Sequence, residues 1–438
     1  ITLDFFLFFF VSMEKNRGVV MKRKIVAITM LSIVTGLVIL NSVKTKDIEV
    51  EKTQKRINNV NTLTMMLETE AGTGNYQEVK QSEWPTDGYV FNASLSRCEN
   101  GGILSWDDEA KKVIMESNVS DKCYVYFDKY NPTLANYIIT NVYTSDGAND
   151  LYYHDGTGSY TNANQEAGDN SYRYSGANPN NYVCFGSDAA TCPNDNLYRI
   201  IGLFDDDKDG AYNIKLIKYD YANSGLLGTD GDYAGIYSTI DSYYRGNLTT
   251  INSYYWNNNT GTNAWDESEL NTINLNENFW NNLGFKWQNM VETFGWKIDN
   301  MYNGIERLSS IKYVYNMEIS NSSNYKIYSN KIGLMYVSDY GYAASPENWT
   351  KSPADYDDTN RNNNWMYMGL AEYTITKNYP TTNQSLYISF LGQIGSGETV
   401  NYVGIAIRPV FYLKHSVTIS SGDGSKENPF RISFDINS

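Results

Sequence analysis

The stretch "LYRIIGLFDDDKDGAYNIKLIKYD" (residues 197–220) places two apolar, β-like runs on either side of an acidic segment. An Asp-Gly pair, Asp209 and Gly210, lies between the runs and is typical of a tight turn. Short apolar runs bounded by turn residues predict buried strands. The sequence therefore predicts a β-hairpin here, within a larger mixed α+β domain.

The acidic segment also begins like a calcium loop. Asp205, Asp207 and Asp209 alternate and are followed by Gly210, as at the start of an EF-hand. The bidentate Glu that should end such a loop is replaced by Leu216, and the flanking segments are predicted strands rather than helices. We interpret the segment as an exposed turn, with a weak calcium site of another type as the alternative.

The N-terminal segment predicts export. From Met21, a basic head (residues 22–24) precedes an uncharged, largely apolar run over 25–40, as in a signal peptide or signal-anchor. No Ala-x-Ala-like cleavage site follows, which favours an uncleaved anchor through residues 25–43 with the remainder outside the cell. Cleavage would instead give a secreted protein. Residues 1–20 are expected to be upstream sequence translated in frame.

Four cysteines agree with an oxidising compartment. An even number of cysteines in an exported chain predicts disulfides, and three pairings are open. Pairing of near neighbours, Cys98 with Cys123 and Cys184 with Cys192, is the simplest. A zinc site is disfavoured because neither pair has Cys-x-x-Cys spacing and the two histidines lie far off.

The chain divides by composition into several parts. After a signal-anchor over 21–43 comes a charged stalk over 44–60, and then a small β module over 61–130. A helix and a Gly/Asn-rich connector occupy 131–182, and the C-terminal α+β domain occupies 183–438.

Several elements are expected within these parts. The first module begins with a hairpin turning near Gly72 and Gly74. A capping-box-like start at Asp266 and Glu269 predicts a helix through Phe279. Later strands are expected in "KIGLMYVSDYGYAA" (331–344), "SLYISFLG" (385–392) and "VGIAIRPVFYL" (403–413).

The order of motifs over roughly 183–432, together with the earlier module "SDKCYVYFDK" (120–129), resembles a family of uncharacterised exported proteins of Gram-positive gut bacteria. In that family a tryptophan segment precedes a terminal Gly-Val-Arg-Pro-like strand. Trp365 stands in the tryptophan segment, although "WMYMG" lacks the Arg-Ser that usually follows there. Gly404, Arg408 and Pro409 stand in the terminal strand. The resemblance implies a displayed α+β domain with no established reaction.

The ending is also similar in outline to the C-type-lectin-like and formylglycine-generating-enzyme fold. That enzyme activity does not carry over, because no cysteine follows Cys192. Arg408 is expected to be structural, its donors holding carbonyls or a carboxylate.

Aromatic residues in loop-like surroundings offer candidate ligand contacts. Trp349, Trp365, Tyr340 and Tyr342 lie in Gly-, Asn- and Asp-rich segments. Such rings stack on sugars when they are exposed, and they are core residues when they are buried. Both interpretations stay open at this point.

The charge balance and motif search narrow the function. A net charge of −15 argues against nucleic acid as a partner. No nucleophile elbow, zinc-protease motif or phosphate loop is present, so we expect no enzyme and no cofactor beyond weak calcium. We expect a cell-surface binding or adhesion protein for a glycan or a protein partner. The alternatives are a structural envelope component and, third, a glycoside hydrolase.

Overall fold

The computed structural model describes residues 62–434 except 70, 72, 81–87, 108–109, 118, 156–165, 207, 231–232, 237–241, 259–260, 299–309, 321–325, 379–380, 396 and 403. The described residues form two compact units, which divide between Tyr130 and Asn131. The predicted anchor over 21–43 lies outside the described residues, and no described helix is long and apolar enough to cross a membrane.

The N-terminal unit is a small β structure. Its main sheet has the order β2-β1-β7-β3, with β4 also paired to β7, and β5 and β6 form a separate hairpin. The strands are β1 (Thr62–Glu68), β2 (Tyr76–Val79), β3 (Tyr89–Phe91), β4 (Arg97–Cys98), β5 (Ile103–Asp107), β6 (Lys112–Glu116) and β7 (Lys122–Lys129). The predicted first hairpin is confirmed by the antiparallel β1–β2 pair, and Gly74 takes the positive φ of +67° that its turn requires.

Alternation along β7 explains the core of this unit. Cys123, Val125 and Phe127 point inward and are fully or almost fully buried, with polar or ring side chains between them. Met65 of β1 packs on Val125 and Phe127, and the Cys98–Cys123 disulfide joins β4 to β7. A core this small gains stability from the cross-link, by about 3 kcal/mol in the chain-entropy model.

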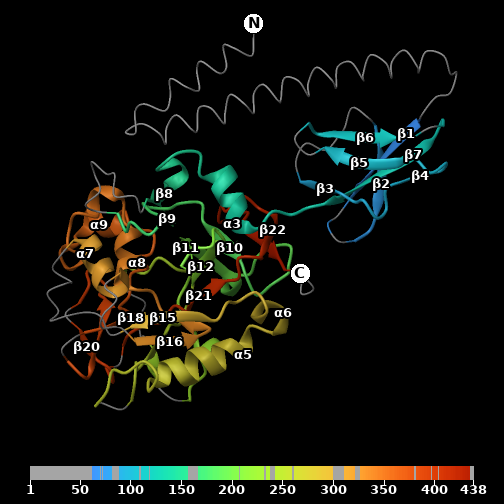
Figure 1. Cartoon of the computed structure of the whole chain (residues 1–438). Helices are drawn as coiled ribbons and strands as arrows, with labels where there is room; N and C mark the ends of the chain where they lie inside the picture. The colour runs from blue at the N-terminus through green and yellow to red at the C-terminus, as the bar shows by residue number, and fades with distance from the viewer. Residues whose placement is uncertain are drawn as a thin grey trace, which may run out of the picture. The chain divides into compact units, whose positions relative to one another are not determined.

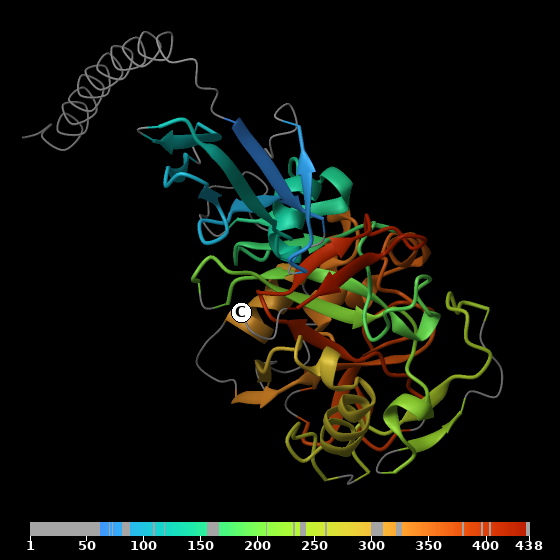
Figure 2. The same cartoon turned by 90° about the vertical axis from the view of Figure 1, so that its right-hand side faces the viewer.

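The C-terminal unit is built around a mixed sheet. Its order is β17-β21-β12-β11-β10-β23-β22, and β9 pairs with β11 and with β8. Figure 2 shows the green strands β11 and β12 beside the red C-terminal strands, although some 200 residues separate Asn213 from Leu413, whose backbone it hydrogen-bonds. The strands are β8 (Leu151–His154), β9 (Ser171–Tyr174), β10 (Tyr182–Cys184), β11 (Leu197–Phe204), β12 (Asn213–Lys218), β17 (Ile332–Gly333), β21 (Val410–Leu413), β22 (Thr418–Ser421) and β23 (Phe430–Ser433).

The opening hairpin lies at the centre of this sheet. Every residue of β11 is buried, as its continuous apolar run predicts. β11 and β12 pair antiparallel from Tyr198–Lys218 to Phe204–Asn213, with a register shift between Ile200 and Gly202. The predicted hairpin is therefore confirmed, and its loop follows Phe204.

Helices and short sheets cover the central sheet. Figure 1 shows α7, α8 and α9 gathered on one side of the sheet and α5 and α6 on another. The main helices are α3 (Leu134–Tyr137), the π-helical η2 (Ile138–Val142), α4 (Ser224–Leu227), the π-helical η5 (Leu270–Phe279), α5 (Trp280–Asn282), α6 (Phe285–Gln288), α7 (Ile311–Tyr315), η7 (Asn316–Ser320), α8 (Val337–Tyr342) and α9 (Asp358–Asn362). The smaller sheets contain β13 (Tyr233–Ile236), β14 (Asn252–Tyr254), β15 (Phe294–Ile298), β16 (Lys326–Asn330), β18 (Glu372–Lys377), β19 (Gln384–Ile388) and β20 (Glu398–Thr399).

Two parts of the sequence prediction need correction. The helix predicted at the start of 131–182 is confirmed by α3 and η2, but the part that follows is not a connector, because β8 and β9 belong to the C-terminal unit and β9 pairs with β11. The strand predicted over 331–344 is also wrong: only β17 is extended, and α8 follows it. The Asp339 carboxylate accepts the Tyr336 N–H at 2.8 Å and caps the first turn of α8, which favours a helix over a strand.

Two further predictions hold in part. The helix expected from Asp266 begins at Leu270, and the Ser268 hydroxyl accepts the Asn271 N–H at its start. Of the strand expected over 403–413, only β21 forms, because Pro409 has no N–H to donate to a sheet. The mixed α+β class and both disulfides, Cys98–Cys123 and Cys184–Cys192, are confirmed.

Close packing of α7 against α8 requires a glycine. A Cβ on Gly341 would lie 1.9 Å from Cδ1 of Ile311. We predict that Gly341→Ala lowers the free energy of unfolding by about 1–3 kcal/mol through overpacking. Ile311→Val, which removes Cδ1, should cost less in the Gly341→Ala background than in the wild type, as measured by urea denaturation in a double-mutant cycle. Additive losses would contradict this packing.

Candidate functional site: a charged pocket in the C-terminal unit

A pocket of about 30 Å³ opens where the central sheet meets α8. This volume accommodates roughly two or three water molecules, so it suits a small group rather than a whole sugar. Its wall includes the rings of Phe204, Phe294, Tyr336 and Tyr412. The charged and polar lining residues are Asp169, Arg173, Asp206, Lys215, Lys297, Tyr315, Ser338 and Asp339.

Two buried ion pairs form the floor. The Arg173 guanidinium lies 2.6 Å from Asp169, and the Lys215 ammonium lies 2.6 Å from Asp339. Arg173 is also 3.8 Å from the second oxygen of Asp339, which links the pairs into one network. Arg173, Lys215 and Asp339 are at most 3% exposed. Buried charges require partners, and here two acids balance two bases.

The strands place these groups together. Lys215 of β12 pairs in register with Tyr412 of β21. Arg173 of β9 pairs with Gly202 of β11, which itself pairs with Lys215. Gly202 is needed for that approach, because a Cβ there would lie 2.5 Å from the Tyr172 carbonyl oxygen. The sheet therefore brings the two cations beside each other, and α8 supplies the opposing carboxylate.

Aromatic rings surround the Lys215 ammonium. It lies 4.5 Å from the ring centroid of Tyr336 and 5.2 Å from that of Tyr412, which is within the range of cation–π attraction. Burial lowers the pKa of Lys215, and the charge and hydrogen bond of Asp339 oppose that shift. The rings and Asp339 together replace the water that this ammonium has lost.

Asp169 is held as a carboxylate. Burial alone would raise its pKa, but the charge of Arg173, with smaller contributions from His154 and a Ser171 hydrogen bond, lowers it to about 2. The Tyr315 hydroxyl also donates to Asp169 at 2.9 Å. A group with this pKa has no proton to donate at neutral pH, so Asp169 is unsuited to general acid catalysis.

The floor still has hydrogen-bonding capacity. Arg173 donates through Nε to Ser171 and through Nη2 to Asp169. Within the described part of the chain, neither Nη1 of Arg173 nor Oδ1 of Asp339 has a hydrogen-bond partner. These two atoms lie 3.8 Å apart. The pocket therefore presents a donor and an acceptor side by side.

Further charges lie around the pocket. Asp206, in the β11–β12 loop, and Lys297 of β15 are both among the lining residues. Loss of water around the Asp206 carboxyl raises its pKa, and the charge of Lys297 acts in the opposite direction. An incoming group would therefore meet one charge of each sign at the rim before reaching the floor.

Glu318, adjacent to the lining residue Ile319, supports the pocket from behind. Its buried carboxylate accepts the Val337 and Ser338 N–H groups at 3.0 and 2.9 Å, at the first turn of α8. Burial raises its pKa to about 7, although hydrogen bonds from Ser338 and Thr376 act against this rise. The helix that carries Asp339 therefore rests on a carboxyl that titrates near neutral pH.

The four aromatic residues suggested for sugar stacking are core residues. Tyr340, Tyr342, Trp349 and Trp365 are 0–4% exposed. Trp349 packs edge-on to Tyr342, with centroids 5.4 Å apart, whereas the Trp365 ring lies 4.5 Å from the Arg199 guanidinium and its indole N–H donates to the Tyr174 carbonyl. The interpretation of these four residues as exposed rings that stack on sugars is therefore wrong. The four residues also do not form one site.

The terminal motif holds the core together. Arg408 is buried and donates from Nε and Nη2 to the two oxygens of Glu372 at 2.8 and 2.9 Å, and also to the Met366 carbonyl. The Pro409 carbonyl accepts the Lys218 N–H, and Gly404 has a φ of +93° that favours glycine. These contacts are of the kind expected for a structural arginine.

The aspartate loop stabilises its own turn. Both carboxylate oxygens of Asp205 accept backbone N–H groups, from Asp209 and Gly210, at 3.1 Å. Asp209 in turn accepts the Ala211 N–H at 2.8 Å. Asp207 lies outside the described residues. Asp205 and Asp209 thus hydrogen-bond to the backbone of their own loop, as in an Asx turn.

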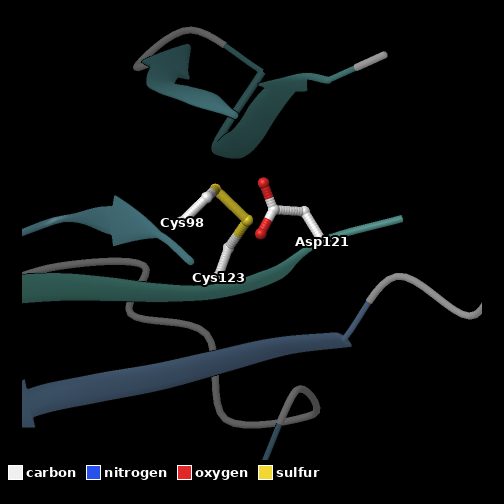
Figure 3. Close-up of side chains that lie close together, drawn as sticks. All are labelled: Cys98, Asp121 and Cys123. Atoms are coloured by element: carbon white, nitrogen blue, oxygen red, sulfur yellow. A yellow bond between two sulfur atoms is a disulfide. The ribbon is translucent and has the colours of Figure 1, made fainter. Parts of the chain in front are cut away.

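A three-residue group in the N-terminal unit has the spacing of a metal site. Ligand atoms of Cys98, Asp121 and Cys123 lie within 4.8 Å of one another, and this is the one such group among the described residues. Figure 3 shows the two sulfur atoms bonded to each other beside the carboxylate. Metal ligation requires thiolates, which a disulfide does not provide.

Asp121 instead holds a turn. Its carboxylate accepts the N–H groups of Asn100, Gly102 and Lys122 at 2.8–2.9 Å. Burial would raise its pKa, but these backbone hydrogen bonds lower it.

Sequence reasoning missed the pocket. Arg173, Lys215 and Asp339 belong to three separate segments and match no local motif. One signal was present: a lysine at Lys215 within a buried, apolar strand, where a charge needs a partner. Its partner could not be identified, because Asp339 lies in a segment that was assigned to a strand.

Comparisons with known proteins give no relative. No family model, no curated protein and no solved structure matches this chain.

Titration of Glu318 should appear in the pH dependence of stability. With its pKa raised to about 7, Glu318 keeps this proton in the folded state up to about pH 7, whereas an unfolded Glu releases it near its ordinary pKa of 4.5. Folded protein therefore binds more protons between these values, and stability falls as pH rises through that window, by about 3 kcal/mol in total from this group. Glu318→Gln should remove this contribution to the difference in the free energy of unfolding between pH 5 and pH 8, measured by urea denaturation. The exposed control Glu347→Gln should keep it, and an unchanged pH dependence in Glu318→Gln would contradict the assignment.

The loop geometry also predicts the response to calcium. Because Asp205 is occupied by backbone donors, about 1 mM calcium should shift the melting temperature by less than roughly 1 °C relative to excess chelator. The triple variant Asp205→Asn, Asp207→Asn and Asp209→Asn should show the same small difference. A wild-type shift of several degrees that the triple variant loses would show that the aspartates bind metal.

Proposed function

We propose that this chain is an extracytoplasmic binding protein rather than an enzyme. Both disulfides support an oxidising compartment, one in each unit, and they use all four cysteines. The basic and apolar segment from Met21 supports export with retention at the membrane. Adhesion at a cell surface, through a lectin-like domain, is the proposal that the resemblance of residues 183–432 adds.

The single observation that carries the binding role is an ion pair that lines the pocket and has no hydrogen bond of its own. Arg173 Nη1 and Asp339 Oδ1 lie 3.8 Å apart in residues that are nearly inaccessible to water. At this distance a ligand or a water molecule can complete the hydrogen bonding of both groups. A ligand with an anionic and a cationic end would pair with both atoms at once.

Pocket size and rim charges restrict that ligand. A volume of about 30 Å³ admits only the end of a molecule. The rim offers Asp206 to an ammonium and Lys297 to a carboxylate. The best fit is a small free amino acid, which carries an ammonium and a carboxylate on the same carbon. This supports a small zwitterion over a neutral glycan for this pocket.

A structural envelope component is the second candidate. The small volume favours it, because two or three ordered waters would also satisfy Arg173 and Asp339. In that case the network would serve only to hold β9, β12 and α8 together.

Calorimetric titration and melting curves of the full-length chain distinguish these roles. Glycine should bind and raise the melting temperature, whereas acetate and methylammonium, each with half of the charge pattern, should bind at least about tenfold more weakly. Asp206→Asn should weaken glycine binding, while the exposed control Glu427→Gln should not. If none of glycine, D-alanine, L-alanine and diglycine binds at about 10 mM, the ligand role of the pocket is rejected and the structural role is favoured.

A further inference from the structure

A pair of exposed rings lies apart from the pocket residues. Tyr243 and Phe390 are 37% and 47% exposed, and their ring centroids are 6.2 Å apart with the planes tilted by 37°. Most large rings of this unit are buried, so two adjacent exposed rings are an exception. Exposed apolar patches of this kind mark interaction sites more often than isolated exposed residues do.

One guanidinium group adjoins an exposed ring, and a second, two residues along the chain from Tyr243, adjoins a buried ring. Arg361 lies 4.7 Å from the Tyr243 ring centroid, and Arg245 lies 4.6 Å from the ring centroid of Tyr367. Arg245 donates to the Arg361 carbonyl at 3.4 Å and to the Asn362 side chain at 2.6 Å. We call Tyr243, Phe390, Arg245 and Arg361 the ring–arginine patch.

The positive charge of the patch is only partly neutralised. Arg361 has an ion pair with Asp358 at 2.8 Å. Within the described residues, no carboxylate lies at ion-pair distance from Arg245. Burial lowers the pKa of Arg245, and the charge of Arg361 acts in the same direction. An anion beside Arg245 would relieve this repulsion, although the chain as a whole carries −15.

The patch is held in place before any ligand arrives. A Cβ on Gly369 would lie 1.9 Å from the Tyr243 carbonyl oxygen, so the loop that carries Tyr243 packs directly against the backbone of Gly369. The Tyr367 hydroxyl donates to the Phe390 carbonyl, and Arg361 donates to the Leu391 carbonyl at 3.2 Å. Such preorganisation reduces the entropy lost on binding.

We propose that the ring–arginine patch binds a carbohydrate that carries a carboxylate. Sugar rings stack on exposed aromatic faces through their C–H groups, so Tyr243 and Phe390 would contact the sugar ring. The planar fork of a guanidinium matches a carboxylate with two parallel hydrogen bonds, which assigns Arg245 to the acid group. Asn362, held by Arg245, adds an amide beside the expected hydroxyls. Nucleic acid, which is anionic along its whole length, is disfavoured by the net charge of the chain.

The test titrates the full-length chain, by calorimetry and saturation-transfer NMR, with glucuronic, galacturonic and sialic acid. The matched ligand control is the methyl ester of each sugar, which keeps the ring and removes the charge. At least one acid should bind, and its ester should bind about tenfold or more weakly. Arg245→Gln should lower the affinity for the acid to that for the ester and leave the affinity for the ester unchanged. Tyr243→Ala and Phe390→Ala should weaken both.

Matched protein controls separate the patch from general effects. Phe285→Ala removes another exposed ring (74% exposed), and Lys286→Gln removes another exposed cation; neither should change binding. Asp206→Asn in the charged pocket should also have no effect, so failure of the pocket and failure of the patch are distinguishable. Equal binding of acid and ester, no change in Arg245→Gln, binding of a sugar phosphate without the sugar acids, or no binding of any acid at about 10 mM would each overturn the proposal.

Discussion

Charge balance in the interior constrains the C-terminal unit more than any other interaction. Arg173 and Lys215 lie on strands that the sheet brings together, and both are almost completely removed from water. Two unopposed cations at this depth would cost several kcal/mol each. The fold meets this cost with Asp169 before β9 and Asp339 on α8. The position of α8 over the sheet is thus tied to the two strands by charge as well as by apolar packing.

The same constraint links stability to the candidate site. Asp339 caps its own helix and pairs with Lys215 through one oxygen, and its other oxygen lies 3.8 Å from Arg173, so the residue that completes the core also lines the pocket. Glu318 then holds the first turn of that helix. A change in the Glu318 charge would act on the helix that carries Asp339, which couples pH to the pocket without any contact between Glu318 and a ligand.

Local patterns in the sequence were sufficient for some elements and insufficient for others. The hairpin around 197–220, the β1–β2 hairpin and the disulfide pairs depend on nearby residues, and these were predicted correctly. Helix α8 was predicted as a strand because "LMYVSDYGY" contains three tyrosines and a valine, whereas the hydrogen bonds that Glu318 accepts from its first turn are visible only in three dimensions. The pocket and the ring–arginine patch combine residues that are 100 or more positions apart. No periodicity or spacing in the sequence reports such pairs.

Aromatic residues illustrate why composition was a poor guide to ligand contacts. The chain has 38 tyrosines, and several buried ones donate their hydroxyl to a backbone carbonyl, as Tyr340 does to Gly392 at 2.7 Å. Tyrosine here replaces part of the aliphatic core, so its presence in a Gly- or Asn-rich segment carries no information about exposure. Tyr243 and Phe390 differ from these core rings because they lie in loops at the surface, whose backbones contact Gly369 and Tyr367. Among the described residues, no further segment covers the two rings, so they stay exposed to solvent. The exposure of an aromatic residue therefore depends on whether its loop lies at the surface of the fold, and not on how frequent aromatic residues are in that part of the sequence.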